Sequence, residues 1–183
     1  DSVYDAVVEK LVEFAKHVPM GVGLDEQNVL GPLQNQKQSD TVDRLVEAAK
    51  ASGATVALGG NPDRDAPGYF YPTTIVTDID PHNDLVIEEQ FGPALPVIRY
   101  TDVEEAIRLA NELEFGLGAS VWSKDRAQAT AIAARLQAGT VWINSHGGLH
   151  PLVPFGGAKQ SGYGREFGVE GLKAVAVPQV VSG

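Results

Sequence analysis

Two adjacent carboxylates stand before an aromatic residue in the segment Glu88–Pro93, which reads E-E-Q-F-G-P. A carboxylate accepts hydrogen bonds from a ribose diol, and a ring such as Phe91 packs against a flat heterocycle. The same two acids, Glu88 and Glu89, also suit a helix end or a solvated acidic surface. The residue types alone leave all of these interpretations open.

A second feature is the crowding of glycines between Gly147 and Gly171. Glycine costs backbone entropy, so a cluster indicates close approach to a ligand, tight turns that line a pocket, or a compact surface loop. No G-x-G-x-x-G follows a strand and opens a helix here, and the chain has no P-loop. We therefore predict no complete nucleotide-phosphate site within these residues.

The chain contains no cysteine, which excludes disulfides, thiolate-ligated metals and a cysteine nucleophile within it. Its four histidines are His17, His82, His146 and His150. None forms a helical pair with a carboxylate between, so we expect no metal site.

Composition narrows the class of protein. The 183 residues carry a net charge of −10, which opposes binding to nucleic-acid phosphates. No apolar run is long enough for a membrane span, so we expect no membrane partner. The opening residues show no signal-peptide pattern, and we expect a cytoplasmic protein.

Periodicity indicates which elements must position these residues. Apolar residues at helical spacing predict helices over about 2–17 and 36–52. A strand is expected over 54–58, and the segment 69–76 is expected to be an edge strand or an irregular extended piece because it contains Pro72.

The centre of the chain alternates between strand and helix. A capping box at Thr101–Glu104 opens one of the helices. The expected order is strand 95–100, helix 101–113, strand 118–122, a helix that Ser123 or Asp125 opens and that runs to about 137, and strand 139–143. This alternation predicts an α/β fold with a mostly parallel sheet and crossover helices.

The chain resembles the aldehyde dehydrogenase superfamily over essentially its whole length. The segment 88–93 is similar to the family's E-E-x-F-G-P motif, and 115–121 (F-G-L-G-A-S-V) to its Y/F-G-L-x-A motif. Residues 139–144 (G-T-V-W-I-N) resemble G-x-V-x-x-N, and 154–162 (P-F-G-G-A-K-Q-S-G) resemble P-F-G-G-x-K-x-S-G. Four such motifs in order are highly specific.

The resemblance implies an NAD(P)-dependent enzyme that oxidises an aldehyde to a carboxylic acid. In this family a cysteine thiolate attacks the aldehyde, and a glutamate later activates water to hydrolyse the thioester. Those residues and the nucleotide-phosphate loop are expected upstream of the position that matches Asp1. Residues 1–173 would be a partial catalytic domain, and 174–183 a final oligomerisation strand that pairs with a neighbouring subunit. Alone, the chain is expected to be inactive.

The resemblance also assigns residues to the cofactor, either NAD or NADP. Glu89 matches the glutamate that accepts hydrogen bonds from the nicotinamide ribose. Phe91 matches the aromatic residue beside the nicotinamide. Gln38 aligns with a position that reaches the same ribose. The alternatives are a structural carboxylate at a turn for Glu89 and a solvated helix residue for Gln38.

On the aldehyde side, Phe155 matches an aromatic residue that lines the substrate entrance. His146, Leu149 and His150 lie in the preceding variable segment and are further substrate-pocket candidates. Asn144, Arg165 and Glu166 are interpreted as scaffold whose polar groups satisfy backbone at turns. Trp122 and Trp142 are expected in the core.

The partners expected are an aldehyde substrate and further copies of the subunit in a homo-oligomer. The alternative hypothesis is a stand-alone, non-catalytic oligomerisation or binding module. Within the family, an acyl-transferring enzyme that passes the thioester to coenzyme A is a further possibility. The sequence identifies neither the aldehyde that is oxidised nor which of NAD and NADP is used.

Overall fold

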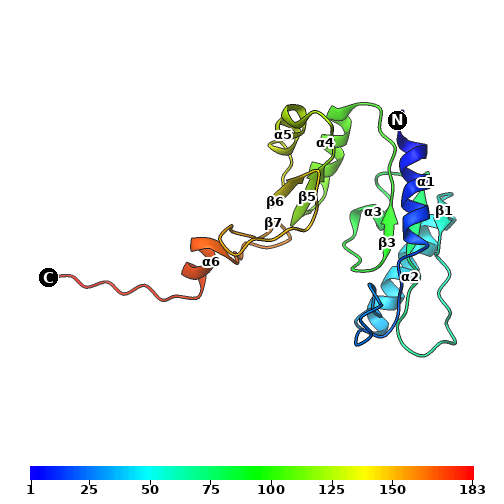
Figure 1. The fold of residues 1–183 in the computed structure, drawn as a ribbon, viewed down its shortest axis with the longest axis horizontal. Coiled ribbons are helices and arrows are strands. Elements are labelled where there is room, and N and C mark those ends of the chain that lie inside the picture. Colours follow the sequence, from blue (N-terminus) through cyan, green and yellow to red (C-terminus); the bar gives the residue numbers. More distant parts are fainter. The chain divides into compact units, whose positions relative to one another are not determined.

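The computed structural model describes all residues from Asp1 to Gly183. The chain divides into two compact units, Asp1–Thr101 and Asp102–Gly183. Both units combine helices with short strands (Figure 1). The α/β class predicted from the sequence is confirmed.

The first unit builds a three-stranded sheet beside helix α2. Its elements are α1 (Tyr4–Ala15), α2 (Gln36–Ala51), β1 (Thr55–Leu58), β2 (Thr74–Thr77), α3 (Asp84–Ile87) and β3 (Ala94–Pro96). The strand order is β1-β2-β3, with β1 antiparallel and β3 parallel to the central strand β2.

Helix α2 supplies the centre of the first core. Its apolar residues recur at helical spacing, and four of them are fully buried: Val42, Leu45, Val46 and Ala49. Asn35 caps the helix by accepting a hydrogen bond from the Gln38 N–H at 2.9 Å. Gly53 ends it with a positive φ of 95°, which glycine adopts without steric cost. Burying each large side chain contributes about 1.5–3 kcal/mol.

Helix α1 behaves differently, because none of its residues is buried. Its first turn is anchored where the Tyr4 hydroxyl donates to the Val97 carbonyl at 2.9 Å. The Arg99 guanidinium lies 4.0 Å from the centre of the Tyr4 ring. Further along, an apolar groove remains open beside the helix. Its lining residues are Lys10, Glu13, Phe14, His17, Val18, Pro19 and Val29.

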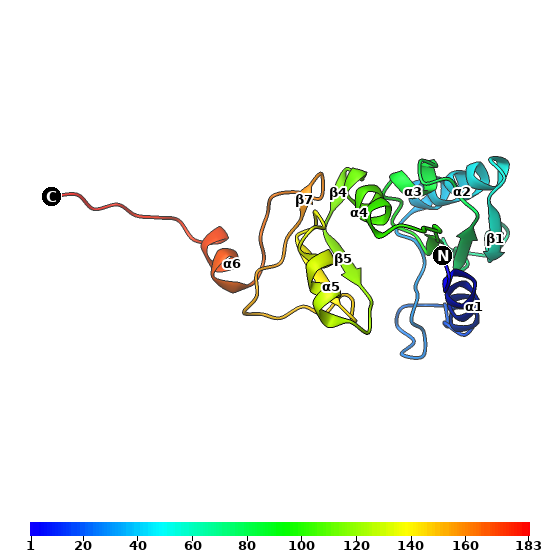
Figure 2. The same ribbon diagram turned by 90° about the horizontal axis from the view of Figure 1, so that it is seen from above.

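The second unit contains a parallel strand pair joined by a crossover helix. Its elements are α4 (Val103–Glu112), β4 (Phe115–Gly116), β5 (Gly118–Val121), α5 (Arg126–Ala133), β6 (Thr140–Ile143), β7 (Ala158–Lys159) and α6 (Gly168–Ala174). Strands β5 and β6 pair in parallel from Gly118 and Thr140 onward. Figure 2 shows α5 beside β5, as expected for a strand–helix–strand unit.

Two sequence expectations are wrong in detail. The strand expected over 95–100 is shorter and covers Ala94–Pro96, and it pairs in parallel with β2, where the Val97 N–H donates to the Val76 carbonyl at 2.8 Å. The cap of α4 is also one residue later than predicted. The Asp102 carboxylate, not Thr101, accepts from the Glu104 N–H at 3.1 Å.

The end of the chain forms no strand of its own. Ala174, predicted to begin that strand, instead ends α6, and residues 175–183 have no regular secondary structure. Their valines are almost fully exposed. Pairing with a neighbouring subunit requires a second chain, so the strand and the division at residue 174 stay predictions.

We expect the open groove beside α1 to drive self-association of this chain, because Phe14 is 73% exposed there. Phe14→Asp should raise the dissociation constant of the self-associated species about tenfold or more, since burying a large apolar side chain is worth roughly 1.5–3 kcal/mol. Light scattering across a concentration series measures this. Leu24→Asp is the control, because Leu24 is 96% exposed and does not line the groove. A wild-type chain that stays monomeric at high concentration would contradict the expectation.

Candidate functional site

The segment 88–93 forms the turn between α3 and β3 in the first unit. Helix α3 is held at its start by Asn83, whose side chain accepts from the Leu85 N–H at 3.0 Å. The backbone becomes extended at Glu88. The turn that follows exposes Glu89 and leaves the Phe91 side chain 75% exposed.

The backbone of Phe91 is in the left-handed region, with φ of 47°. A bulky residue there is unusual, and the conformation costs on the order of 1–3 kcal/mol. A residue whose backbone is strained and whose aromatic ring is open to solvent contributes little to this unit's own core. Such a residue is typical of a surface that contacts a ligand.

Contacts from α2 hold this turn in place. Arg44 Nη2 forms an ion pair with Glu88 Oε2 at 2.8 Å. The Gln38 amide donates to the Gln90 carbonyl, which lies on the peptide between Gln90 and Phe91. Helix α2 therefore contacts the turn on both sides of Glu89.

The last residues of the turn pack directly against the core. A methyl group added at Gly92 would lie 2.4 Å from a Cγ atom of the fully buried Val42. The Gln90 amide donates to the Ala94 carbonyl at 2.8 Å and closes the turn onto β3. The glycine of the E-E-Q-F-G-P motif is thus required by close packing against α2.

The structure brings together the three cofactor candidates of the first unit. Glu89 and Phe91 lie on the turn, and Gln38 reaches it from α2. The Gln38 side chain donates to backbone at the turn, so it is not a freely solvated helix residue. Contact of these three residues with a ribose and a nicotinamide stays a prediction.

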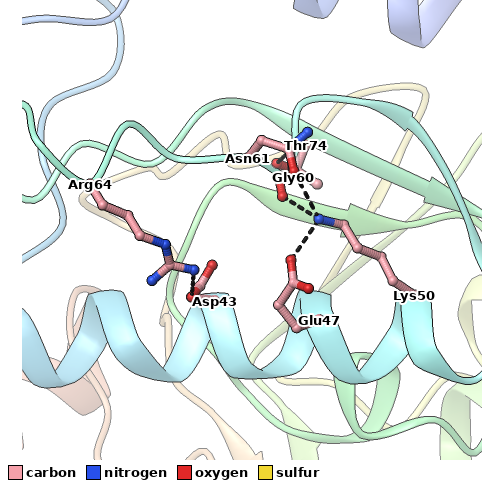
Figure 3. Close-up of polar contacts among 7 residues, drawn as sticks. All are labelled: Asp43, Glu47, Lys50, Gly60, Asn61, Arg64 and Thr74. Carbon is pink, nitrogen blue, oxygen red and sulfur yellow. Dashed lines mark hydrogen bonds and ion pairs between the residues drawn. The ribbon is translucent and has the colours of Figure 1, made fainter.

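A second group of polar contacts holds the loop after β1 to α2 (Figure 3). Lys50 Nζ donates to Glu47 Oε1 and to the Gly60 carbonyl, each at 2.6 Å. Arg64 pairs with Asp43 at 2.5 Å. Tyr71 is buried, and desolvation together with the nearby Asp43 carboxylate raises the pKa of its phenol. Sequence reasoning did not find this group, because Lys50 and Gly60 lie 10 residues apart and Asp43 and Arg64 lie 21 residues apart.

In the second unit, the segment after β6 holds three of the aldehyde-side candidates. The rings of Trp142 and His146 are tilted against each other, with centroids 4.9 Å apart. Trp142 Nε1 donates to the Gly148 carbonyl at 2.8 Å, which folds the glycine pair back onto the indole. Leu149 is half exposed.

His150 contacts the backbone of this loop. Its Nδ1 accepts a hydrogen bond from the Leu152 N–H at 3.2 Å. His150 is exposed, as is His146. Each histidine therefore offers the solvent a polar ring edge beside apolar neighbours.

Phe155 is half-buried and lies opposite Glu166 in a short antiparallel bridge. The Phe155 N–H donates to the Glu166 carbonyl at 2.9 Å, and the Glu166 N–H donates back at 2.8 Å. The backbone of Phe155 is thus fixed by the end of the glycine-rich segment. Its place at a substrate entrance stays a prediction.

Asn144 and Arg165 act as scaffold within the second unit. The Asn144 side chain exchanges two hydrogen bonds of 2.9 Å with the backbone of Ser123, linking the ends of β5 and β6. Arg165 donates to the Gly157 and Gly164 carbonyls at 2.9 and 2.8 Å. The scaffold interpretation of Asn144 and Arg165 agrees with these contacts.

Two further motif residues link the glycine-rich segment to α4 and β4. Lys159 Nζ donates to the carbonyls of Asn111 and Leu113 at 2.6 and 2.8 Å, at the end of α4. Ser161 Oγ accepts from the Gly116 N–H at 3.0 Å. A cation is stabilised at a helix C-terminus, so this lysine is explained without a ligand.

The core expectation for Trp122 is wrong, because its side chain is 65% exposed. It lies just beyond the end of β5, where its Nε1 donates to Ser120 Oγ at 3.1 Å. Trp142 is only partly buried. A short two-stranded sheet has no second layer to cover both indoles.

The residues of the turn 88–93 and of the loop after β6 are suited to binding a ligand. The turn offers a carboxylate acceptor and an aromatic face, and the loop after β6 offers apolar and imidazole surface. No three His, Asp or Glu side chains gather closely enough to hold a metal ion. No helix is both long and apolar enough to cross a membrane.

Comparison with known proteins gives one consistent family. The sequence matches the aldehyde dehydrogenase family over residues 1–181. It is 40% identical over 171 residues to the succinate-semialdehyde dehydrogenase (NADP(+)) 1 of Mycobacterium ulcerans, covering 93% of this chain and 37% of that protein. It is 42% identical over 168 residues to the betaine aldehyde dehydrogenase of Brucella anthropi, covering 90% of this chain and 34% of that protein.

Solved structures agree. An NAD+ complex of an aldehyde dehydrogenase from Bacillus cereus matches with a TM-score of 0.88 and 40% identity, over 94% of this chain and 35% of that chain. A betaine aldehyde dehydrogenase from Staphylococcus aureus in complex with NAD+ matches with a TM-score of 0.88 and 37% identity, over 99% of this chain and 38% of that chain. The chain thus spans little more than a third of these relatives.

Gly92→Ala tests the packing of the turn. The added methyl group would overlap Val42, so we expect a loss of about 1–3 kcal/mol in the free energy of unfolding. Urea unfolding followed by circular dichroism measures the change. Gly23→Ala is the control, because nothing lies within 4 Å of the added carbon there, and it should change stability by less than about 1 kcal/mol. Equal stability of the two variants would show that the turn does not pack on α2 in this way.

Proposed function

The chain belongs to the aldehyde dehydrogenase family, and we propose that it supplies the nicotinamide-ribose wall and the aldehyde entrance of an NAD(P)-dependent enzyme. That enzyme oxidises an aldehyde to a carboxylic acid. The observation that carries the proposal is the turn that α2 holds and that exposes Glu89 beside a strained, solvent-open Phe91.

The exposed groups of this turn fit a nicotinamide ribose. An ionised carboxylate at Glu89 has only acceptor sites, which match the two hydroxyl donors of a ribose diol. The face of Phe91 fits a flat, electron-poor ring. The cofactor supplies hydride acceptance when bound, and Glu89, Phe91 and Gln38 would orient its nicotinamide end.

The turn residues Glu89, Phe91 and Gln38 are not expected to distinguish NAD from NADP. A Mycobacterium ulcerans relative is named for NADP(+), and structures of two other relatives contain NAD+. Glu89 would touch the ribose of the nicotinamide, which both cofactors share. The turn is therefore expected to serve either cofactor.

On the aldehyde side, we propose that Phe155 and Leu149 provide apolar contact and that His146 and His150 provide polar ring edges. The Trp142 hydrogen bond to Gly148 would hold this loop in one shape. Relatives named for succinate semialdehyde and betaine aldehyde show that substrates differ within the family. The loop after β6 is where such selection would act.

The covalent step needs a thiolate, and this chain contains no cysteine. We propose that the cysteine which forms the thioester, and the base which activates water, belong to residues outside this chain. Residues 174–183 would then pair with the sheet of a second copy, in a homo-oligomer. Pro178 lacks an N–H and would leave one ladder position unbonded in that strand.

The chain alone should not oxidise aldehydes with either cofactor, because removing the nucleophile removes the covalent mechanism. Absorbance at 340 nm with an aldehyde and NAD+ or NADP+ measures this. Robust cofactor reduction by a preparation free of longer enzyme would contradict the proposal. Absence of activity in the complete native protein would favour the alternative, a non-catalytic oligomerisation or binding module.

Glu89→Gln, made in a complete enzyme that contains this chain, should weaken the hold on the nicotinamide ribose. An amide accepts fewer and weaker hydrogen bonds than a carboxylate, so we expect hydride transfer to slow about tenfold. Single-turnover kinetics measure the step directly. Glu9→Gln, an exposed residue of α1 with no side-chain partner, is the control. An unchanged rate and cofactor KM for Glu89→Gln would return Glu89 to a structural role at a turn.

A further inference from the structure

We propose that Arg44 is a positioning residue for Glu89, acting through Glu88 and not through contact with the cofactor. The proposal rests on the function proposed above for Glu89. It assigns a role to a residue that none of the four family-like motifs includes.

The geometry makes Arg44 the charged link between α2 and the turn. Its ion pair with Glu88, at 2.8 Å, is the one ion pair that the turn makes. The Gln38 bond to the Gln90 carbonyl lies on the other side of Glu89. Glu89 is therefore bracketed by two contacts that both originate on α2.

Two consecutive residues of α2 form ion pairs with two different segments. Asp43 pairs with Arg64 of the loop after β1, whereas Arg44 pairs with Glu88 of the turn. Neighbouring side chains on a helix point roughly 100° apart, so one helix can reach both segments. The buried residues on either side of this pair, Val42 and Leu45, fix the rotation of the helix.

Charge gives Arg44 a second effect on the turn. Glu88 and Glu89 carry adjacent carboxylates, which repel each other because they have the same charge. Both also repel an anionic dinucleotide. Pairing with Arg44 neutralises Glu88 and leaves Glu89 as the free acceptor. Without Arg44, the turn would be less ordered and more negatively charged. Both changes oppose cofactor binding.

The expected size of the effect follows from exposure. The Arg44 and Glu88 side chains are 54% and 44% exposed, so solvent and salt weaken their attraction. If the turn adopts the competent geometry for a smaller fraction of the time, the apparent dissociation constant rises by the inverse of that fraction. Once the cofactor is bound the turn is ordered, and turnover at saturation should not change.

The first test uses this chain without cofactor. In Arg44→Met, backbone nitrogen-15 relaxation should show increased motion at the amides of Glu89 and Phe91, with α2 unchanged. Arg44→Lys, which keeps the charge, should restore most of the order. Unchanged motion of the turn in Arg44→Met would overturn the proposal.

The second test uses a complete enzyme that contains this chain. Arg44→Met should raise the KM for the cofactor about threefold at low salt, with kcat and the aldehyde KM unchanged. The difference should fade at 0.5 M salt, where exposed charges are screened. A fall in kcat with no change in cofactor KM would overturn the proposal.

Arg108→Met is the matched control for general loss of a surface ion pair. Arg108 pairs with Glu112 on α4, and its side chain is also 54% exposed. An equal rise in cofactor KM for Arg108→Met would overturn the positioning role of Arg44. Failure of the proposed function has a different signature: Glu89→Gln would leave cofactor kinetics unchanged while Arg44→Met still loosens the turn.

Discussion

The buried face of α2 is the constraint on which the first unit depends. Val42, Leu45, Val46 and Ala49 have no exposed surface, so the helix can take only one rotation against β1 and β2. That rotation directs Asp43 and Lys50 to the loop after β1 and Arg44 and Gln38 to the turn after α3. An apolar stripe that binds nothing thereby determines where the exposed carboxylate of Glu89 is presented.

The stripe itself could be read from the sequence, because helical periodicity is local. The helix bounds of α2 follow from the same local rules. The candidates Glu89, Phe91 and Gln38 came from the resemblance to aldehyde dehydrogenases, since two acids before an aromatic residue suit several roles. The contacts of Arg44 could not be predicted, because Glu88 is 44 residues away and either side chain has many other possible partners.

Strand pairing shows the same limit in both units. The alternation of strands and helices predicted the parallel pair β5–β6, but it did not predict that β3 pairs with β2. Periodicity gives the type of an element, and only tertiary hydrogen bonds give its neighbour. In the second unit, Asn144, Lys159 and Arg165 add side-chain hydrogen bonds to backbone carbonyls. These three side chains thus hold the backbone of the second unit in place.

The central claim is that α2 and the turn present Glu89 to a nicotinamide ribose. The most direct measurement is a crystal structure of a complete enzyme containing this chain, with NAD+ or NADP+ bound. The account predicts the Glu89 carboxylate within hydrogen-bond distance of the ribose hydroxyls, with the Phe91 ring beside the nicotinamide and Arg44 still paired with Glu88. A bound cofactor whose ribose is held by other residues, with Glu89 facing solvent, would contradict it.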